Sequence, residues 1–185
     1  MQVEKSLPRT RRGLTLVELM TTLAVAGVSL AVAIPSWSAL TDRSQVTTTT
    51  NRLLGHLRYA RSEAVTRRRM VSLCPSDDGA TCSGDPFGWQ RGYLIFQDTD
   101  GNRSRSDDET LLRVQRALPP GMRLHSTAGR PAIRFRPDGA AWSTNTSFSV
   151  CVGDTGNVNR AVVLYGSGRA RVGSTLPGER PVTCT

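Results

Sequence analysis

Two arginines near the C-terminus, Arg169 and Arg171, have the type and spacing to bind phosphate groups. In an extended segment, residues two apart point to the same side, and a guanidinium group matches phosphate oxygens bidentately. Residues 166–168 (Gly-Ser-Gly) predict a turn before them, which would expose the pair at a loop tip or at the start of a strand. We therefore expect a polyanion contact here, with Arg160 and Arg180 as weaker flanking contacts. The alternative is two solvated arginines on the outer face of an edge strand.

The distribution of charge favours an anionic partner. The chain has 185 residues, of which 24 are basic and 15 acidic, and a net charge of +9. Arginines outnumber acids over residues 42–76 and 110–185, whereas acids outnumber arginines over residues 77–109. An acidic middle and a basic C-terminal part predict a domain with one anion-binding face. The hydrophobic content of 38% is ordinary for a folded domain and excludes wholesale disorder.

Two further features are either polyanion contacts or structural. Trp142 or Tyr165 could stack on bases, although an aromatic residue in a sheet is more often part of a core. The run Arg67-Arg68-Arg69 falls where a long helix should end, and the helix dipole favours cations at that position. The run is therefore a helix-end cluster or a second strip of phosphate contacts.

Four cysteines favour two disulfide bonds if the domain is exported. Cys74 and Cys82 bracket a turn-rich loop, whereas Cys151 lies on a predicted strand and Cys184 is the next-to-last residue. Of the three possible pairings we expect Cys74–Cys82 and Cys151–Cys184, the second of which would pin the C-terminal tail to the sheet. A zinc site is the rival, and the lack of a CxxC spacing in the sequence counts against it.

The acidic segment 98–109 is a candidate for calcium binding. Its oxygen-bearing residues fall at positions 1, 3, 5, 7 and 12 of the EF-hand pattern, namely Asp98, Asp100, Asn102, Ser104 and Glu109. Position 6, where the pattern needs glycine, is Arg103, and the flanks indicate strands rather than helices. We therefore expect a polar hairpin loop, and neither a metal ion nor a cofactor.

No set of residues in the sequence predicts an enzyme. The sequence has no P-loop and no dinucleotide fingerprint, and residues 166–168 lack the extra residue that a nucleophile elbow needs between Gly and Ser. The two histidines are His56, on the predicted helix, and His125, beside a predicted strand. The sequence names no partner that would make either a catalytic base.

The elements that would position these residues are one long helix and many short strands. Leu53, Leu57, Ala60 and Ala64 recur at helical spacing and form a narrow apolar stripe. Beyond Arg69, short strand-like runs are bounded by turn residues. The predicted strands are 70–73, 89–97, 110–116, 122–125, 132–136, 147–152, 161–165 and 170–173. A long helix packed on an antiparallel β-sheet predicts an α+β fold.

The first forty residues differ from the rest. Residues 1–13 carry a net charge of +3, and residues 19–41 carry none. A run of roughly 20 apolar residues spans a bilayer as a helix, and a basic flank before it keeps the N-terminus in the cytoplasm. A cleaved secretory signal peptide and a plain membrane anchor both fit this pattern. Neither accounts for Glu18, because a carboxylate within the membrane costs roughly 3 kcal/mol.

A third interpretation accounts for Glu18. Residues 12–19 (Arg-Gly-Leu-Thr-Leu-Val-Glu-Leu) resemble the class III leader of type IV pilins and pseudopilins, and Pro35 matches the proline that kinks pilin helices. The resemblance implies that prepilin peptidase cuts after Gly13 and that Leu14 becomes the N-methylated first residue. It also implies that Glu18 neutralises a neighbouring subunit's terminal amine during assembly.

This leader divides the chain into three parts. Residues 1–13 would be the leader peptide, residues 14–41 a transmembrane and assembly helix, and residues 42–185 a periplasmic pilin head. The expected location is the inner membrane, crossed once, and then a pilus or pseudopilus at the cell surface. The expected partners are other pilin subunits, prepilin peptidase and the inner membrane before assembly.

The head is similar to the FimT/GspH family of minor pilins and pseudopilins. Four segments recur there in this order, namely residues 73–76, 88–98, 135–139 and 168–171. The last is Gly168-Arg169-Ala170-Arg171, a GRxR motif that FimT-type minor pilins use to bind DNA in natural transformation. The resemblance implies a pilin-like fold and sequence-independent DNA binding through Gly168, Arg169 and Arg171. The alternatives are a structural minor pseudopilin of a type II secretion system and a periplasmic binding module with a cleaved signal peptide.

Overall fold

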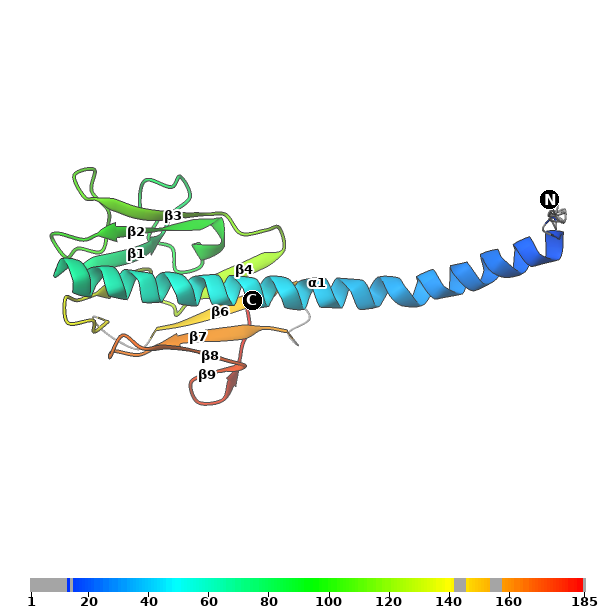
Figure 1. The fold of residues 1–185 in the computed structure, drawn as a ribbon. Helices are drawn as coiled ribbons and strands as arrows, with labels where there is room; N and C mark the ends of the chain where they lie inside the picture. The colour runs from blue at the N-terminus through cyan, green and yellow to red at the C-terminus, as the bar shows by residue number, and fades with distance from the viewer. Residues whose placement is uncertain (1–12, 14, 142–145, 154–157, 185) are drawn as a thin grey trace, which may run out of the picture. The chain divides into compact units, whose positions relative to one another are not determined.

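The computed structural model describes residue 13 and residues 15–141, 146–153 and 158–184; for residues 30–36 and 38 it describes the backbone alone (Figure 1). The chain forms two compact units, Met1–Leu40 and Thr41–Thr185. The helix α1 (Leu16–Arg67) begins in the first unit and ends in the second. All strands among the described residues lie in the second unit.

In the first unit, α1 begins with a side-chain cap. The Thr15 hydroxyl accepts a hydrogen bond from the Glu18 amide at 3.2 Å, and Glu18 places its carboxylate in the first turn, where the helix dipole favours negative charge. Large apolar side chains of this unit, such as Leu16 and Leu23, are exposed. No helix within the described residues is long and apolar enough to cross a membrane, so the transmembrane segment predicted at 14–41 is not confirmed.

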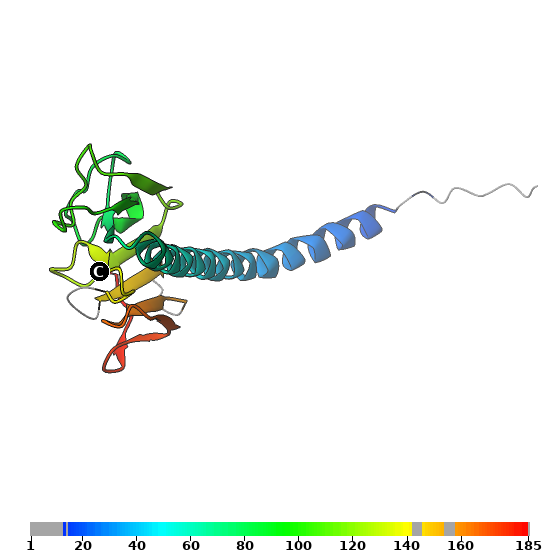
Figure 2. The ribbon, with the colours of Figure 1, turned by 60° about the vertical axis from the view of Figure 1, so that its left-hand side comes forward.

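In the second unit, two four-stranded antiparallel sheets pack against the C-terminal half of α1 (Figure 2). The first sheet has the order β3 (Leu111–Arg116), β2 (Gly92–Gln97), β1 (Val71–Pro75), β5 (Ile133–Phe135). The second sheet has the order β4 (Met122–Ser126), β6 (Thr146–Val152), β7 (Arg160–Leu164), β8 (Ala170–Gly173). A one-turn 3-10 helix, η1 (Trp89–Arg91), precedes β2, and β9 (Thr175–Leu176) pairs with β10 (Arg180–Pro181).

The predicted apolar stripe of the helix is the centre of the core. Its members Leu53, Leu57, Ala60 and Ala64 are at most 1% exposed and pack with residues of both sheets. Trp89 closes one part of this core, because its ring lies 4.9 Å from that of Phe148 and its indole N–H donates to the Ser126 hydroxyl. This packing confirms the α+β fold.

The strands follow the prediction with three differences. The sequence predicted one sheet, but the structure has two four-stranded sheets, because the apolar stripe of α1 packs against strands of both. Residues 89–91 form a 3-10 helix rather than the start of a strand. Gly92, at φ 136, makes the bend between η1 and β2, and a side chain there would meet two backbone carbonyls at 2.8 Å. The two-residue strands β9 and β10 are too short to give a periodic signal.

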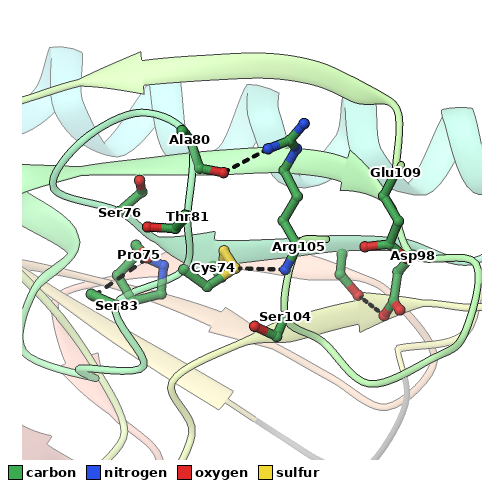
Figure 3. The surroundings of a disulfide bond; sticks show 12 residues. Cys74, Pro75, Ser76, Ala80, Thr81, Ser83, Asp98, Ser104, Arg105 and Glu109 are labelled. Carbon is green, nitrogen blue, oxygen red and sulfur yellow. Dashed lines mark hydrogen bonds between the residues drawn. A yellow bond between two sulfur atoms is a disulfide. The ribbon is translucent and has the colours of Figure 1, made fainter. Parts of the chain in front are cut away.

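Both predicted cysteine pairs are disulfide bonds in the structure. Cys151–Cys184, with Cα atoms 6.2 Å apart, holds the C-terminal tail against the second sheet, on the face away from α1. Cys74–Cys82, with Cα atoms 5.6 Å apart, closes a loop that Arg105 also contacts. The Arg105 amide donates to the Cys82 sulfur at 3.3 Å, and its guanidinium donates to the Ala80 carbonyl at 2.8 Å (Figure 3).

The arginine run lies at the end of α1, as predicted. The Arg69 amide donates to the Ala64 carbonyl at 3.2 Å and the Arg68 amide to the Val65 carbonyl at 3.3 Å, which is the Schellman arrangement. Arg68 has a φ of 52°, a left-handed conformation that glycine usually supplies at this position. The run therefore contributes the helix-ending turn.

Candidate nucleic-acid interface

The GRxR motif begins in a tight hairpin between β7 and β8. The Gly168 amide donates to the Tyr165 carbonyl at 2.8 Å, and the Tyr165 amide donates to the Arg169 carbonyl at 2.9 Å. These bonds leave a three-residue loop, 166–168, whose last residue has a φ of 76°. Such loops place a glycine in the left-handed conformation before the second strand resumes. The predicted turn is therefore present, and it delivers Arg169 at the start of β8.

Gly168 is also in close contact with a second turn. A Cβ atom on Gly168 would lie 2.0 Å from the carbonyl oxygen of Gly139, in the turn after β5. The Ala141 amide adds a hydrogen bond to the Gly166 carbonyl at 3.0 Å, so the two turns are joined directly. Gly168 thus positions Arg169, and its lack of a side chain is what permits the contact.

The hairpin and the end of α1 form a groove of about 660 Å³. Its lining residues are Arg58, Arg61, Ser62, Val65, Thr66, Gly168, Arg169 and Ala170. Arg61 lies at the point where the turns meet, because its Nε atom is 3.1 Å from the Cβ position of Gly168 and equally far from that of Gly139. Three arginines from two segments more than 100 residues apart in sequence therefore line one cavity.

The groove is electropositive. Its described lining includes three arginines, two hydroxyl residues and no acid. Within the described part of the chain, Arg58, Arg61 and Arg169 form no ion pair, whereas Arg67 pairs with Glu63. Arg58 and Arg169 are exposed and Arg61 is half-buried. Cations that are gathered without counter-charges repel one another, and a bound anion would relieve that repulsion. The arrangement can hold phosphate or carboxylate groups.

Arg171 lies on a different face from the groove. It pairs with Val163, which packs with Ala161 and Cys151 on the face of the second sheet that the C-terminal tail covers. Arg171 is exposed there and does not line the groove. The expectation that Arg169 and Arg171 share one side of an extended segment assumed regular pleating through both residues, but Arg169 precedes β8 and belongs to the hairpin.

The structure does not bring the two flanking arginines to the groove. Arg160 lies at the opposite end of β7 from the hairpin, and its guanidinium donates to the Asn159 carbonyl at 2.9 Å. Arg180 lies in β10, donates to the Pro177 carbonyl at 3.1 Å and lines a separate pocket beside Thr127. Spacing in sequence placed them near the motif, whereas the strand directions separate them.

Of the two aromatic candidates, the structure places one, Tyr165, beside the motif. Tyr165 is 37% exposed at the first position of the hairpin, directly opposite Arg169. It is therefore available to stack on a base and is not a core residue. Trp142 lies outside the described residues.

Sequence reasoning missed Arg58 and Arg61. They are three residues apart, so they share one side of the helix, and this spacing was the available signal. It was weak, because arginines on an exposed helix face are common and only the packing of the hairpin against α1 makes these two part of a site.

Of the N-terminal candidates, Gly13 is described and exposed, and Leu14 lies outside the described residues. Glu18 is exposed in the first turn of α1. Its side chain is thus on the surface of the first unit, close in sequence to the expected cleavage point. No described contact assigns it to the head.

The two histidines make structural contacts. His56 Nδ1 lies 2.7 Å from the Tyr93 hydroxyl. Burial lowers the pKa of His56, and the positive charges of Arg113 and Arg52 lower it further. The His125 ring meets Phe87 edge to face, and burial also lowers the pKa of His125. Both rings therefore favour the neutral form in packed surroundings.

Comparisons with known proteins identify the family. Residues 49–168 match the family model "Type II transport protein GspH", and residues 8–34 match the "Prokaryotic N-terminal methylation motif". The chain is 30% identical over 168 residues to the pilin-like protein PilA1 of Thermus thermophilus. The aligned region covers 88% of this chain and 99% of PilA1.

Two solved structures share the fold. The type IV minor pilin FimU of Pseudomonas aeruginosa is 22% identical, with a TM-score of 0.59 over 74% of this chain and 96% of that chain. The minor pseudopilin EpsH of the Type 2 Secretion System of Vibrio cholerae is 17% identical, with a TM-score of 0.50 over 73% of this chain and 99% of that chain. The family matched here and these structural neighbours are pilins and pseudopilins rather than enzymes. The chain belongs to the GspH family of type IV minor pilins and pseudopilins.

Proposed function

We propose that this minor pilin binds DNA without sequence preference, through the groove between α1 and the β7–β8 hairpin, during DNA uptake in natural transformation. The observation that carries the proposal is the gathering of Arg58, Arg61 and Arg169 in one groove without an acidic residue in its described lining. A phosphate backbone supplies closely spaced anions that such a groove can bind. Gly168 serves by holding Arg169 beside Arg61.

The groove supports a revised set of contacts. Arg169 remains the central residue of the GRxR motif, with Arg58 and Arg61 as its partners from α1. Arg171 would contact a duplex that extends past the hairpin to the outer face of β8. Tyr165, exposed beside Arg169, would stack on a base of a single strand. Arg160 lies at the end of β7 away from the hairpin and Arg180 lies in the separate β9–β10 sheet, so neither lines the groove.

The salt dependence of binding tests the phosphate contacts. Three neutralised phosphates predict a slope near −2.7 in log affinity against log salt, so affinity should fall about 40-fold between 50 and 200 mM salt. A few phosphate contacts predict micromolar or weaker binding by one subunit. Several copies within a filament would strengthen binding through avidity.

The decisive variant is Arg61→Ala combined with Arg169→Ala. We would titrate the full chain, in non-ionic detergent with disulfides formed, into a fluorescent 20-base-pair duplex at both salt concentrations. Loss of most binding, with a shallower salt slope, is the expected result. The matched control, which also removes two positive charges, is Arg52→Ala combined with Arg116→Ala; both arginines are exposed and neither lines the groove. Equal losses in the double variant and the control would mean that net charge, and not the groove, attracts DNA.

We also propose the maturation that the methylation motif indicates. Prepilin peptidase would cut after Gly13, Leu14 would be N-methylated, and residues 14–41 would anchor the subunit in the inner membrane before assembly. Glu18 would then neutralise the terminal amine of a neighbouring subunit. Mass spectrometry of the chain purified from its own cells tests this, because it should begin at methylated Leu14. A chain cut at residue 33 would instead indicate a secretory signal peptide.

A structural pseudopilin is the second candidate. The match to the GspH model and the fold shared with EpsH favour it independently of any DNA contact. Under this proposal the chain occupies a short periplasmic filament of a type II secretion system. Absence of DNA binding at 50 mM salt by the folded chain would select this candidate over DNA uptake.

A further inference from the structure

The loop after β2 brings three carboxylates together on the side of the first sheet. Oxygens of Asp98, Asp100 and Glu109 lie within 4.8 Å of one another. Asp98 follows the last residue of β2, and Glu109 lies two residues before β3, so the two strands hold the ends of the loop. Asp98 and Glu109 lie beside one another in Figure 3. Two oxygens that bind one calcium ion at about 2.4 Å are at most about 4.8 Å apart, so this cluster has the size of a calcium site.

The environment of the Asp98 carboxylate indicates a missing ligand. Asp98 is fully buried, and its Oδ2 accepts a hydrogen bond from the Ser72 hydroxyl at 2.5 Å. Among the described residues its Oδ1 has no hydrogen-bond partner at ordinary geometry, although the Gly101 backbone amide interacts with the carboxylate. A buried carboxylate oxygen without a donor is costly, and a bound cation would remove that cost.

The surrounding charge also favours a cation. Near the buried Asp98 carboxylate lie the Ser72 hydroxyl, the Arg134 charge and the Gly101 backbone amide, which partly offset the cost of its burial. Arg134 also donates to the Gly101 carbonyl. Even with this one guanidinium, three carboxylates leave an excess of negative charge at the cluster. A divalent ion would balance that excess.

The rest of the loop is already held in place. The Thr99 amide donates to Glu109 Oε1 at 2.6 Å and the Ser106 amide to Glu109 Oε2 at 3.1 Å. Arg105 fastens the middle of the loop to the Cys74–Cys82 loop (Figure 3). A site that is fixed in this way loses little chain entropy when an ion binds.

We propose that Asp98, Asp100 and Glu109 bind a calcium ion. The expectation of a metal-free polar loop rested on Arg103 at the position where an EF-hand has glycine. Arg103 nevertheless adopts a left-handed conformation, with a φ of 66°, so the turn forms without glycine. Calcium accepts carboxylates, backbone oxygens and water in a flexible geometry, whereas magnesium demands a near-regular octahedron, so calcium is the ion that we expect here. The affinity expected of an extracellular module is a Kd of about 0.1–1 mM.

The experiment uses the full chain in non-ionic detergent after removal of metals with EDTA. Titration calorimetry with CaCl₂ should show one saturable site, and 10 mM CaCl₂ should raise the Tm by about 5 °C. The same concentration of MgCl₂ should give a smaller rise. The absence of both saturable heat and a Tm shift with CaCl₂ would overturn the proposal, as would an equal response to both salts.

Two variants separate the site from general charge. Asp100→Asn removes a carboxylate of the cluster at an exposed position, so the fold should survive and calcium affinity should fall at least tenfold. Asp108→Asn removes the same charge from an exposed position in the same loop and should bind calcium like the parent chain. Equal affinities in these two variants would show that the cluster is not the site. This proposal is independent of DNA binding, because the Arg61/Arg169 double variant should bind calcium normally.

Discussion

Replacing Gly168 with alanine tests whether the GRxR glycine positions its arginine. The new Cβ would lie 2.0 Å from the Gly139 carbonyl oxygen, well inside the roughly 3.4 Å of ordinary contact. The left-handed φ of 76° adds a cost of about 1–2 kcal/mol for any residue with a Cβ. Overpacking against a backbone that cannot rotate away costs about 1–3 kcal/mol more. We therefore expect a loss of about 2–5 kcal/mol in the free energy of unfolding.

Two other glycines make the controls for this substitution. Gly178 has the same φ of 76° but no atom within 4 Å of its Cβ position, so Gly178→Ala isolates the backbone strain. Gly166 has no left-handed φ and no atom within 4 Å of its Cβ position, so Gly166→Ala should change stability by less than about 1 kcal/mol. Thermal unfolding of the full chain in detergent, with disulfides intact, gives the three Tm values. The expected order of Tm loss is Gly168, then Gly178, then Gly166, with a loss on the order of 10 °C for Gly168→Ala.

The same variant also separates position from charge. Gly168→Ala removes no cation, yet it must move the hairpin away from Gly139 and so shift Arg169 relative to Arg61. At a temperature where the variant is folded, its affinity for duplex DNA should fall at unchanged net charge. If Gly168→Ala and Gly178→Ala lose equal stability, the close contact with Gly139 is not present in solution. The account of the groove would then be wrong.

Three further predictions concern stability. Arg68→Gly should stabilise the fold by about 1 kcal/mol, seen as a higher Tm, because Arg68 holds a left-handed φ of 52° at the end of α1. Burial lowers the pKa values of His56 and His125 below the ordinary 6.5, so the folded chain binds fewer protons than the unfolded chain, and the Tm should fall as the pH drops from 7 towards 5. A Tm that is flat over this range would contradict those shifts. Replacing Cys151 and Cys184 together with serine should cost about 3 kcal/mol by freeing the C-terminal tail, and an unchanged Tm would contradict that role.

The fold was predictable where the sequence pattern has a physical period. The stripe Leu53, Leu57, Ala60, Ala64 follows the helical repeat, and all four are buried. β6 and β8 lie within one residue of their expected bounds, because turn residues mark their ends. Residues 89–91 were predicted as strand because Trp89 is apolar. Trp89 is indeed buried, but a buried apolar residue occurs equally in a strand and in a 3-10 turn.

The hairpin side of the groove could be predicted from the sequence, whereas the helix side, with Arg58 and Arg61, depends on tertiary contacts. The Gly-Ser-Gly turn predicted the hairpin that the structure shows, and the predicted cation Arg169 lines the groove, whereas anion binding itself stays a prediction. Which cations share the site depends on strand direction and on helix packing, neither of which has a local signal. Arg160 and Arg180 are near the motif in sequence but do not line the groove, whereas Arg58 is far from the motif in sequence and does.

The contact between Gly139 and Gly168 links two motifs that sequence comparison treats as separate. The turn after β5 carries one glycine and the β7–β8 hairpin carries the other, and each has a left-handed φ. A Cβ on either would meet Arg61 Nε at 3.1 Å, so both glycines make room for the same guanidinium. The two turns therefore position Arg61 beside Arg169 together. If the proposed DNA binding holds, a substitution at Gly139 should weaken it as one at Gly168 should, because both would displace Arg61.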